Sequence, residues 1–218
     1  MPVKVRSGSM GRVARAILFD LDRTLVDLQN YTDYAAALDD LRALLDGWAE
    51  FTVLDADWDA PTLECMAILV ALAGDPRWDA ASAAVARHEF AAIPASHAMP
   101  GLAEAADLAR TTPYAVVTLL PPDVARGALE HHGFPVDVIV GRDPRIRAKP
   151  HGDGLIVAAE RLGVDVAQCV MIGDSTWDHA AAMEAGASFI GVPATPGAFG
   201  PEVEVAGGLV EAVRRILG

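Results

Sequence analysis

The chain has 218 residues, of which 52% are hydrophobic and 22% charged, and its formal net charge is −13. This length fits one large domain or a core domain with a smaller insert, and it suffices to bury a core without cross-links. The acidic balance argues against a nucleic-acid partner, which requires a basic face. No window is long and apolar enough to span a membrane, so we expect a cytoplasmic protein without a membrane partner. The two cysteines, Cys65 and Cys169, form no metal or redox spacing and are expected to be small core residues.

Residues 1–14 are polar and lack periodicity, which predicts a flexible leader. The following apolar run, residues 16–19, predicts a strand buried on both faces, and Asp20 and Asp22 come directly after it. If the chain stays extended, both carboxylates point to the same side. Two like charges so close require a cation, and oxygen ligands favour Mg²⁺. A polar turn with Asp22 as a helix cap is the alternative for this stretch alone.

The next seventy residues show helical spacing. Apolar positions predict helices over residues 32–48, 62–73 and 78–90. Between about residues 27 and 98 there is no convincing strand, so this region is expected to be a helical insert with its own small core. Its three tryptophans are expected to pack that core: Trp48, Trp58 and Trp78.

After residue 99 the pattern changes to strands that alternate with helices. A short helix to about Arg110 comes first; strands then follow at 114–118, 136–140, 169–172 and 188–192, with helices at 122–132, 152–162, 176–185 and 203–217. This alternation predicts an α/β fold, a parallel sheet with helices on both faces. In such sheets reactive groups gather beyond the carboxyl ends of the strands.

Polar residues follow several of these predicted strands. Each has a structural alternative: Thr118 as an ordinary strand residue, Lys149 as a solvated surface group, Asp174 or Ser175 as a helix cap, and Asp178 as a first-turn acid. In this order and on these elements, together with Asp20 and Asp22, they indicate one site at one edge of the sheet.

These residues resemble the motifs of the haloacid dehalogenase superfamily, in its phosphatase branch with a helical cap, of the phosphoglycolate phosphatase kind. The resemblance rests on Asp20-Leu-Asp22-Arg-Thr24-Leu25, Val116-Val-Thr118, Lys149-Pro150 and the run from Gly173 to Gly186. It implies a Rossmann-like parallel sheet with helices on both faces. The implied domains are an α/β core of residues 15–26 and 99–218, and an α-helical cap of residues 27–98 inserted after the first strand.

The resemblance also implies Mg²⁺-dependent hydrolysis of a small phosphomonoester. Asp20 would be the nucleophile and form an aspartyl-phosphate, and Asp22 would be the general acid and base. Asp20, the backbone carbonyl of Asp22, and Asp174 would hold Mg²⁺. Behind these ligands, Asp178 and Ser175 would complete the site, with Asp178 orienting water or Lys149.

The phosphate group would be bound by Thr118, the amide of Leu119, Lys149 and Arg23. Two positions depart from the usual motifs. Arg23 replaces the usual glycine, and it either reaches phosphate or a substrate carboxylate or points to solvent. Leu119 and Leu120 follow Thr118, where many relatives carry a polar residue, so a substrate contact is expected to be missing.

Alternative functions differ in what they require at the same positions. A phosphosugar mutase shares the nucleophile and acid but keeps water out, whereas a 2-haloacid dehalogenase-like enzyme needs no acid equivalent to Asp22. A non-catalytic binding protein on this fold is the third alternative. The expected partner is a small phosphate ester, and the sequence fits a monomer or a homodimer.

Overall fold

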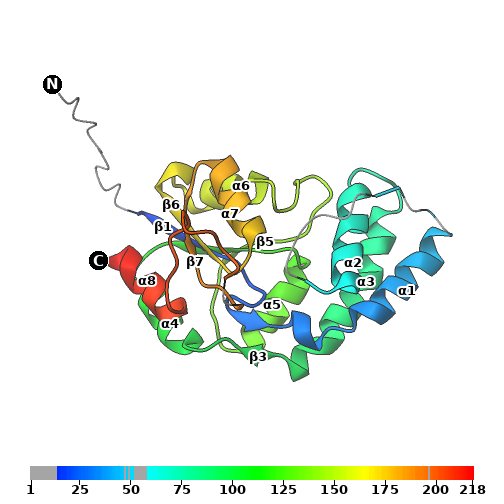
Figure 1. The fold of residues 1–218 in the computed structure, drawn as a ribbon, viewed down its shortest axis with the longest axis horizontal. Coiled ribbons are helices and arrows are strands. Elements are labelled where there is room, and N and C mark those ends of the chain that lie inside the picture. The colour runs from blue at the N-terminus through cyan, green and yellow to red at the C-terminus, as the bar shows by residue number, and fades with distance from the viewer. Residues whose placement is uncertain (1–13, 47, 49, 52–57, 196) are drawn as a thin grey trace.

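The computed structural model describes residues 14–46, 48, 50–51, 58–195 and 197–218, so the predicted leader lies outside the described residues except for Ala14. Five parallel strands form one sheet in the order β5-β4-β1-β6-β7 (Figure 1). The strands are β1 (Ala16–Phe19), β4 (Tyr114–Val117), β5 (Val138–Val140), β6 (Cys169–Gly173) and β7 (Ser188–Gly191). The predicted α/β class with a parallel sheet is confirmed.

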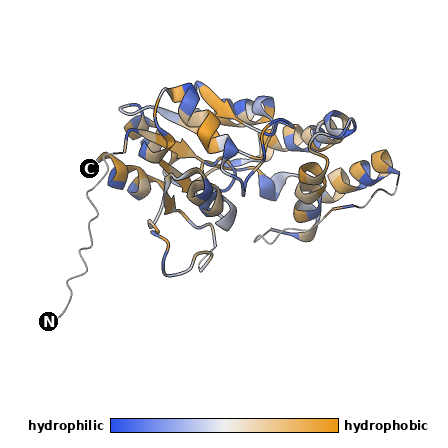
Figure 2. Cartoon of the chain, turned by 90° about the horizontal axis from the view of Figure 1, so that it is seen from above, coloured by the Kyte–Doolittle hydropathy of each residue, from blue (hydrophilic) through white to orange (hydrophobic). Residues whose placement is uncertain are grey.

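Helices cover both faces of this sheet. Apolar side chains of α4 (Leu102–Ala109), α5 (Pro122–His131) and α8 (Leu209–Leu217) form one hydrophobic cluster with Ile17 and Phe19. The opposite cluster joins Ala16 and Leu18 to α6 and α7, which span Asp153–Leu162 and Thr176–Ala185. Alternate β1 side chains thus enter opposite layers, which explains why the whole strand is apolar. In Figure 2 the strand arrows in the middle of the molecule are largely orange, the colour of hydrophobic residues.

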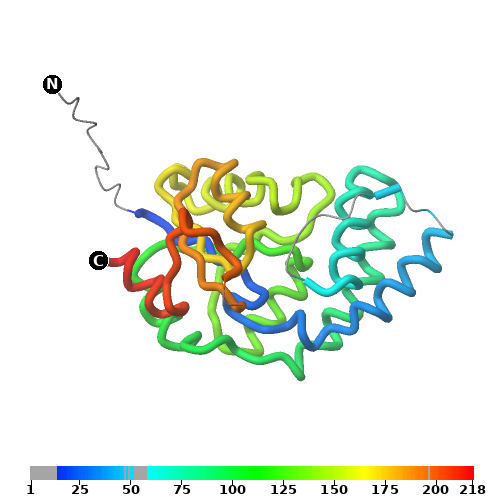
Figure 3. Tube along the Cα trace, in the orientation of Figure 1, coloured from blue at the N-terminus to red at the C-terminus, as the bar shows by residue number. Residues whose placement is uncertain are grey.

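A helical segment lies at the end of the molecule opposite α8 (Figure 3). It contains α1 (Tyr34–Leu45), α2 (Ala60–Ala71) and α3 (Trp78–Ala92), whose buried side chains form a third hydrophobic cluster. Asp33 and Asp59 cap α1 and α2 by accepting backbone hydrogen bonds three residues onward. Short 3-10 helices complete the chain at Gln29–Tyr31, Ile93–Ala95 and Val166–Gln168.

A two-stranded antiparallel ribbon joins the helical segment to the sheet. It pairs β2 (Val26–Asp27) with β3 (His97–Ala98), and the Met99 amide donates to the Leu25 carbonyl at 2.9 Å. The expectation of no strand in this region missed the ribbon, because two-residue strands are too short to show periodicity. The chain therefore leaves the sheet and returns to it at one place.

The helix predicted over residues 203–217 is shorter in the structure, where its first residue comes later. It begins at Leu209 rather than at residue 203, because Gly207 and Gly208 interrupt the apolar pattern, and Val205 instead bridges to Gly191. Among the described residues, no helix is both long and apolar enough to cross a bilayer.

Candidate active site

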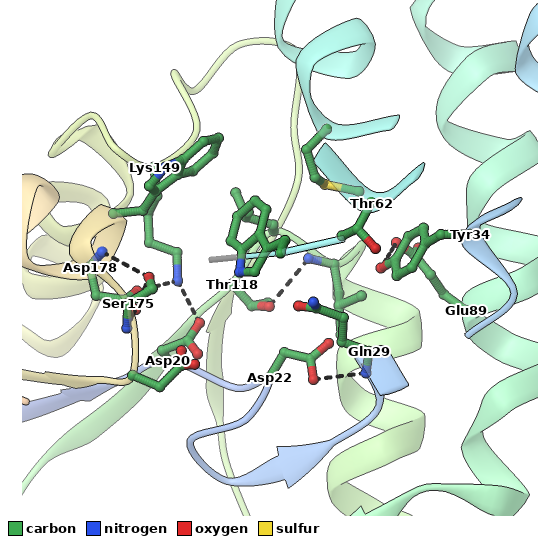
Figure 4. A pocket seen from close by; sticks show the side chains of 16 residues that line it. Asp20, Asp22, Gln29, Tyr34, Thr62, Glu89, Thr118, Lys149, Ser175 and Asp178 are labelled. Carbon is green, nitrogen blue, oxygen red and sulfur yellow. Dashed lines mark hydrogen bonds and ion pairs between the residues drawn. The ribbon is translucent and has the colours of Figure 1, made fainter. Parts of the chain in front are cut away.

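Three adjacent strands end at the site. Asp20 follows β1, Thr118 follows β4 and Asp174 follows β6, and β1 lies between the other two in the sheet. All three side chains are at least nine-tenths buried, and they line one cavity together with Asp22 and Lys149 (Figure 4). The structure thus brings together the residues that the sequence predicted at this edge.

Lys149 connects two of the carboxylates. Its Nζ lies 2.5 Å from Oδ1 of Asp20 and 2.6 Å from Oδ1 of Asp178, and all three side chains are buried. Burial lowers the pKa of Lys149, but the carboxylates of Asp178 and Asp20 raise it by more than burial lowers it. The pKa therefore lies above its usual value, and the ammonium keeps its charge. Lys149 is therefore a fixed positive group in the cavity rather than a solvated surface lysine.

Asp22 is held by the turn that follows β1. Its Oδ1 accepts hydrogen bonds from the amides of Leu28 (3.0 Å) and Gln29 (2.9 Å). Burial raises the pKa of Asp22 to about 7, although these two hydrogen bonds lower it. A carboxyl group in this environment can both release and accept a proton near neutral pH.

Asp178 is engaged through both of its oxygens. Lys149 donates to Oδ1, while Ser175 donates to Oδ2 through its hydroxyl (2.6 Å) and its amide (3.1 Å). Ser175 in turn accepts a bond from the Asp178 amide, so the pair forms a capping box at the start of α7. Ser175 thus caps the helix, which was its structural alternative in the sequence analysis. The same hydrogen bonds hold Asp178 in place as the partner of Lys149.

A cation would fit between the acidic side chains. Carboxylate oxygens of Asp20, Asp174 and Asp178 lie within 4.8 Å of one another. Burial raises the pKa of Asp174 to about 8 and of Asp20 to about 6, with neighbouring carboxylates adding to the shift. Buried oxygen donors that repel one another suit a hard divalent cation. Since Asp178 already accepts three hydrogen bonds from Lys149 and Ser175, Asp20 and Asp174 are the carboxylates better placed to bind one.

The segment after β4 supplies further contacts. Oγ1 of Thr118 accepts a hydrogen bond from the Leu120 amide at 3.2 Å. Leu119 lines the cavity, and its carbonyl accepts a bond from Arg142 at 3.3 Å. The Leu119 amide makes no hydrogen bond to the described residues, so it remains available to an anion in the cavity.

Arg23 lies beside the acidic cluster, and it is absent from the described residues that line the cavity. Its Nε is 3.4 Å from Oδ2 of Asp174, and one Nη is 3.1 Å from Oγ1 of Thr195. Its backbone has a φ of 61°, the left-handed region that glycine adopts without strain. Arg23 thus keeps the backbone conformation of the usual glycine and directs its side chain toward Asp174.

The helical segment contributes residues that the sequence analysis did not identify. Tyr34, Thr62 and Glu89 line the cavity, one from each of α1, α2 and α3. Trp58, which was expected to pack the helical core alone, also lines the cavity and contacts Trp177 of α7 with ring centroids 4.7 Å apart. No local motif marks these positions, because each side chain meets its partner only in the fold.

Comparison with known proteins places this site in a family. A sequence model described as haloacid dehalogenase-like hydrolase matches residues 14–186. The probable phosphatase IndB of Dickeya dadantii is 32% identical over 184 residues, covering 81% of this chain and 80% of that protein. The phosphoglycolate phosphatase of Xylella fastidiosa (strain Temecula1) is 30% identical over 197 residues, covering 85% and 82%.

A solved structure shows the same fold. CbbY from Rhodobacter sphaeroides in complex with phosphate superposes with a TM-score of 0.68 at 21% identity, covering 91% of this chain and 96% of that chain. Residues 14–186, which match the family model, include Asp20, Asp22, Lys149 and Asp174. The chain belongs to the haloacid dehalogenase-like hydrolases.

Proposed function

We propose that this haloacid dehalogenase-like phosphatase hydrolyses a small phosphomonoester in two steps through Asp20. The observation that carries the proposal is the gathering of Asp20, Asp22, Thr118, Lys149 and Asp174 around one cavity. Phosphoryl transfer mainly requires such positioned charges. The relatives named as phosphatases support the same reaction class.

Asp20 is the nucleophile in this proposal. A carboxylate oxygen of Asp20 bonds to phosphorus while the ester oxygen leaves, and Asp22 gives that oxygen a proton. Water then attacks phosphorus, Asp22 takes a proton from it, and the bond between phosphorus and Asp20 breaks. The products are the free alcohol and inorganic phosphate. The ion pair of Lys149 with Asp20 supports this assignment, since it keeps the attacking group ionised.

The phosphate is bound by Lys149, the hydroxyl of Thr118 and the amide of Leu119. We assign the metal to Mg²⁺, held by Asp20, the backbone carbonyl of Asp22, and Asp174. When bound it neutralises charge on the phosphate and the carboxylates. Asp178 and Ser175 hold Lys149 in place from behind, as their hydrogen bonds indicate.

The helical segment is proposed as the cap, residues 27–98, over a core of residues 15–26 and 99–218. Its three helices face the carboxylates across the cavity, through Tyr34, Thr62 and Glu89. A cap in this position excludes water and surrounds the leaving group.

The test is phosphate release from p-nitrophenyl phosphate and ethyl phosphate, with Mg²⁺ and with EDTA. Native protein is expected to turn over only with Mg²⁺, and Asp20→Asn is expected to lose at least about 10³-fold in kcat because the nucleophile is gone. Asp137→Asn, an exposed aspartate of the loop before β5, is the matched control and keeps full activity. Equal activity of Asp20→Asn would exclude Asp20 as the nucleophile.

A further inference from the structure

The cavity has a second polar end opposite the carboxylates. Tyr34, Thr62 and Glu89 form it, and their exposed fractions are 5%, 2% and 0%. Figure 4 shows the three side chains grouped on the far side of the cavity from Asp20 and Lys149. We name this group the cap triad. A leaving group attached to a phosphate at Asp20 would extend toward it.

Glu89 is neutralised from outside the cavity. Arg142, from the loop after β5, donates to both of its oxygens, with Nη2 to Oε2 at 2.9 Å and Nη1 to Oε1 at 3.1 Å. Its other hydrogen bonds go to the hydroxyl and carbonyl of Ser82 and to the carbonyl of Leu119. These contacts occupy all five N–H donors of the guanidinium. Arg142 therefore has no donor left for a ligand.

Two triad hydroxyls keep free hydrogen-bonding capacity. Tyr34 donates its proton to Oε1 of Glu89 at 3.3 Å, which leaves its oxygen as an acceptor. Burial and the nearby Glu89 raise the pKa of Tyr34, so it remains a neutral phenol. Oγ1 of Thr62 is buried without a hydrogen-bond partner among the described residues, and Thr62 is one of the residues that line the cavity. A buried hydroxyl without a partner is costly, and a ligand hydroxyl would satisfy it.

The charge of the cavity selects against a second anion. Of the side chains described as lining it, Lys149 alone is positive, and Asp20 and Asp178 already hold it. A carboxylate at the triad would find no free cation, because Glu89 and its neighbours already occupy Arg142, and its desolvation would not be compensated. A neutral hydroxyl can instead exchange hydrogen bonds with Thr62 and Tyr34. Trp58, Met66 and Leu119 offer apolar walls for the carbon chain.

We infer that the cap triad selects small phosphate esters whose leaving group is a neutral polyol and rejects those whose leaving group carries a carboxylate. The volume of the whole cavity is about 40 Å³, and it must also admit the phosphate, which suits a leaving group of few atoms. This inference rests on the proposed phosphatase function. It separates the chain from its relatives named phosphoglycolate phosphatase, since glycolate carries a carboxylate.

The decisive comparison uses glycerol 3-phosphate and 3-phosphoglycerate, which differ by a hydroxymethyl group in place of a carboxylate. We expect kcat/KM for glycerol 3-phosphate to be at least about tenfold higher. Thr62→Val keeps the shape of the side chain and removes the hydroxyl. It is expected to lower kcat/KM for glycerol 3-phosphate about tenfold and to lower kcat/KM for ethyl phosphate, which has no further hydroxyl, much less.

Controls separate this inference from the phosphatase proposal. Thr111→Val, at an exposed threonine remote from the cavity, should change kcat/KM for neither substrate. Thr62→Val should keep or raise the Tm of the native protein, because its buried hydroxyl has no partner to lose. Preference for 3-phosphoglycerate, or an equal loss for both esters in Thr62→Val, would overturn the inference while the phosphatase function stands. If no ester is hydrolysed, calorimetric titration of native protein with the same pair of esters decides it: tighter binding of glycerol 3-phosphate supports the triad, and equal or weaker binding overturns it.

Discussion

The guanidinium of Arg23 lies against the carboxylate of Asp174, with Nε 3.4 Å from Oδ2. Asp174 is buried beside Asp20 and Asp178, so a cation bound by this cluster would share the Asp174 carboxylate with Arg23. The positive charge of Arg23 lowers the pKa of Asp174, while burial, Asp20 and Asp178 raise it. The residue that replaces the usual glycine thus acts on the proposed metal site rather than facing solvent.

Arg23→Gly should therefore bind Mg²⁺ more tightly. Removing the guanidinium frees an oxygen of Asp174 and removes a like charge from the cation, and glycine also suits the φ of 61°. We expect the dissociation constant for Mg²⁺, measured by calorimetry, to fall about threefold to tenfold. Arg110→Gly, at an exposed arginine of the core, is the control. Weaker Mg²⁺ binding in Arg23→Gly would instead show that Arg23 supports the site.

Asp174→Asn should stabilise the metal-free protein at high pH. The folded pKa of Asp174 is raised from 3.8 to about 8, so its stabilising protonation is complete below pH 3.8 and is lost as the pH rises to about 8. Asparagine carries no charge and avoids this loss. In EDTA, the Tm of Asp174→Asn should exceed that of native protein at pH 8, and the difference should shrink at pH 5.

The same two proteins, native and Asp174→Asn, also test the proposed metal site when Mg²⁺ is added. At pH 8 it should raise the Tm of native protein, because binding to the folded state alone adds stability, and it should have much less effect on Asp174→Asn. An identical rise in both proteins would remove Asp174 from the ligand set.

Breaking the buried ion pair of Arg142 with Glu89 should be costly. Arg142→Met or Glu89→Gln leaves one buried charge without its partner, for an expected loss of about 3–5 kcal/mol in the free energy of unfolding. The double variant should lose less than the sum of the two, and urea denaturation measures all three. Arg145→Met, which breaks an exposed pair with Asp143, should change little. Additive losses would show that the pair is not coupled.

Neither cysteine should react in the native protein. Burial raises the pKa of Cys65 to about 12 and of Cys169 to about 11, so almost no thiolate exists at pH 8. Iodoacetamide followed by intact-mass measurement should show no adduct in native protein and two adducts in urea. A rapid single adduct under native conditions would mean that one thiol is accessible.

The sequence was most informative where neighbours in the chain determine the structure. The strand of residues 16–19 and the two aspartates after it form one local motif, and the structure places them as expected. Helix starts at Pro122 and Thr176 were also predicted, since proline and a Ser-x-x-Asp cap mark them locally.

The cap triad was not predictable in the same way. Glu89 occupies a helix position that periodicity assigns only as polar, and its partner Arg142 is 53 residues further along the chain. Thr62 looks like an ordinary first-turn residue, and its significance comes from having no partner in the described fold. Sequence patterns identify which residues are polar, but three-dimensional packing decides which of them share a cavity.

The paired strands β2 and β3 have an evolutionary consequence. They hold Val26 and Ala98 side by side, so the ends of the intervening residues 27–97 meet without help from the helices themselves. A replacement that closes the same ribbon can leave the sheet in place, since loop closure costs little more as a loop lengthens. It must also supply the two amides that hold Asp22 and an acidic partner for Arg142. Recombination at this ribbon that keeps these contacts would exchange the proposed selector of the leaving group as a unit, and the proposed phosphate chemistry of the sheet would be inherited with it.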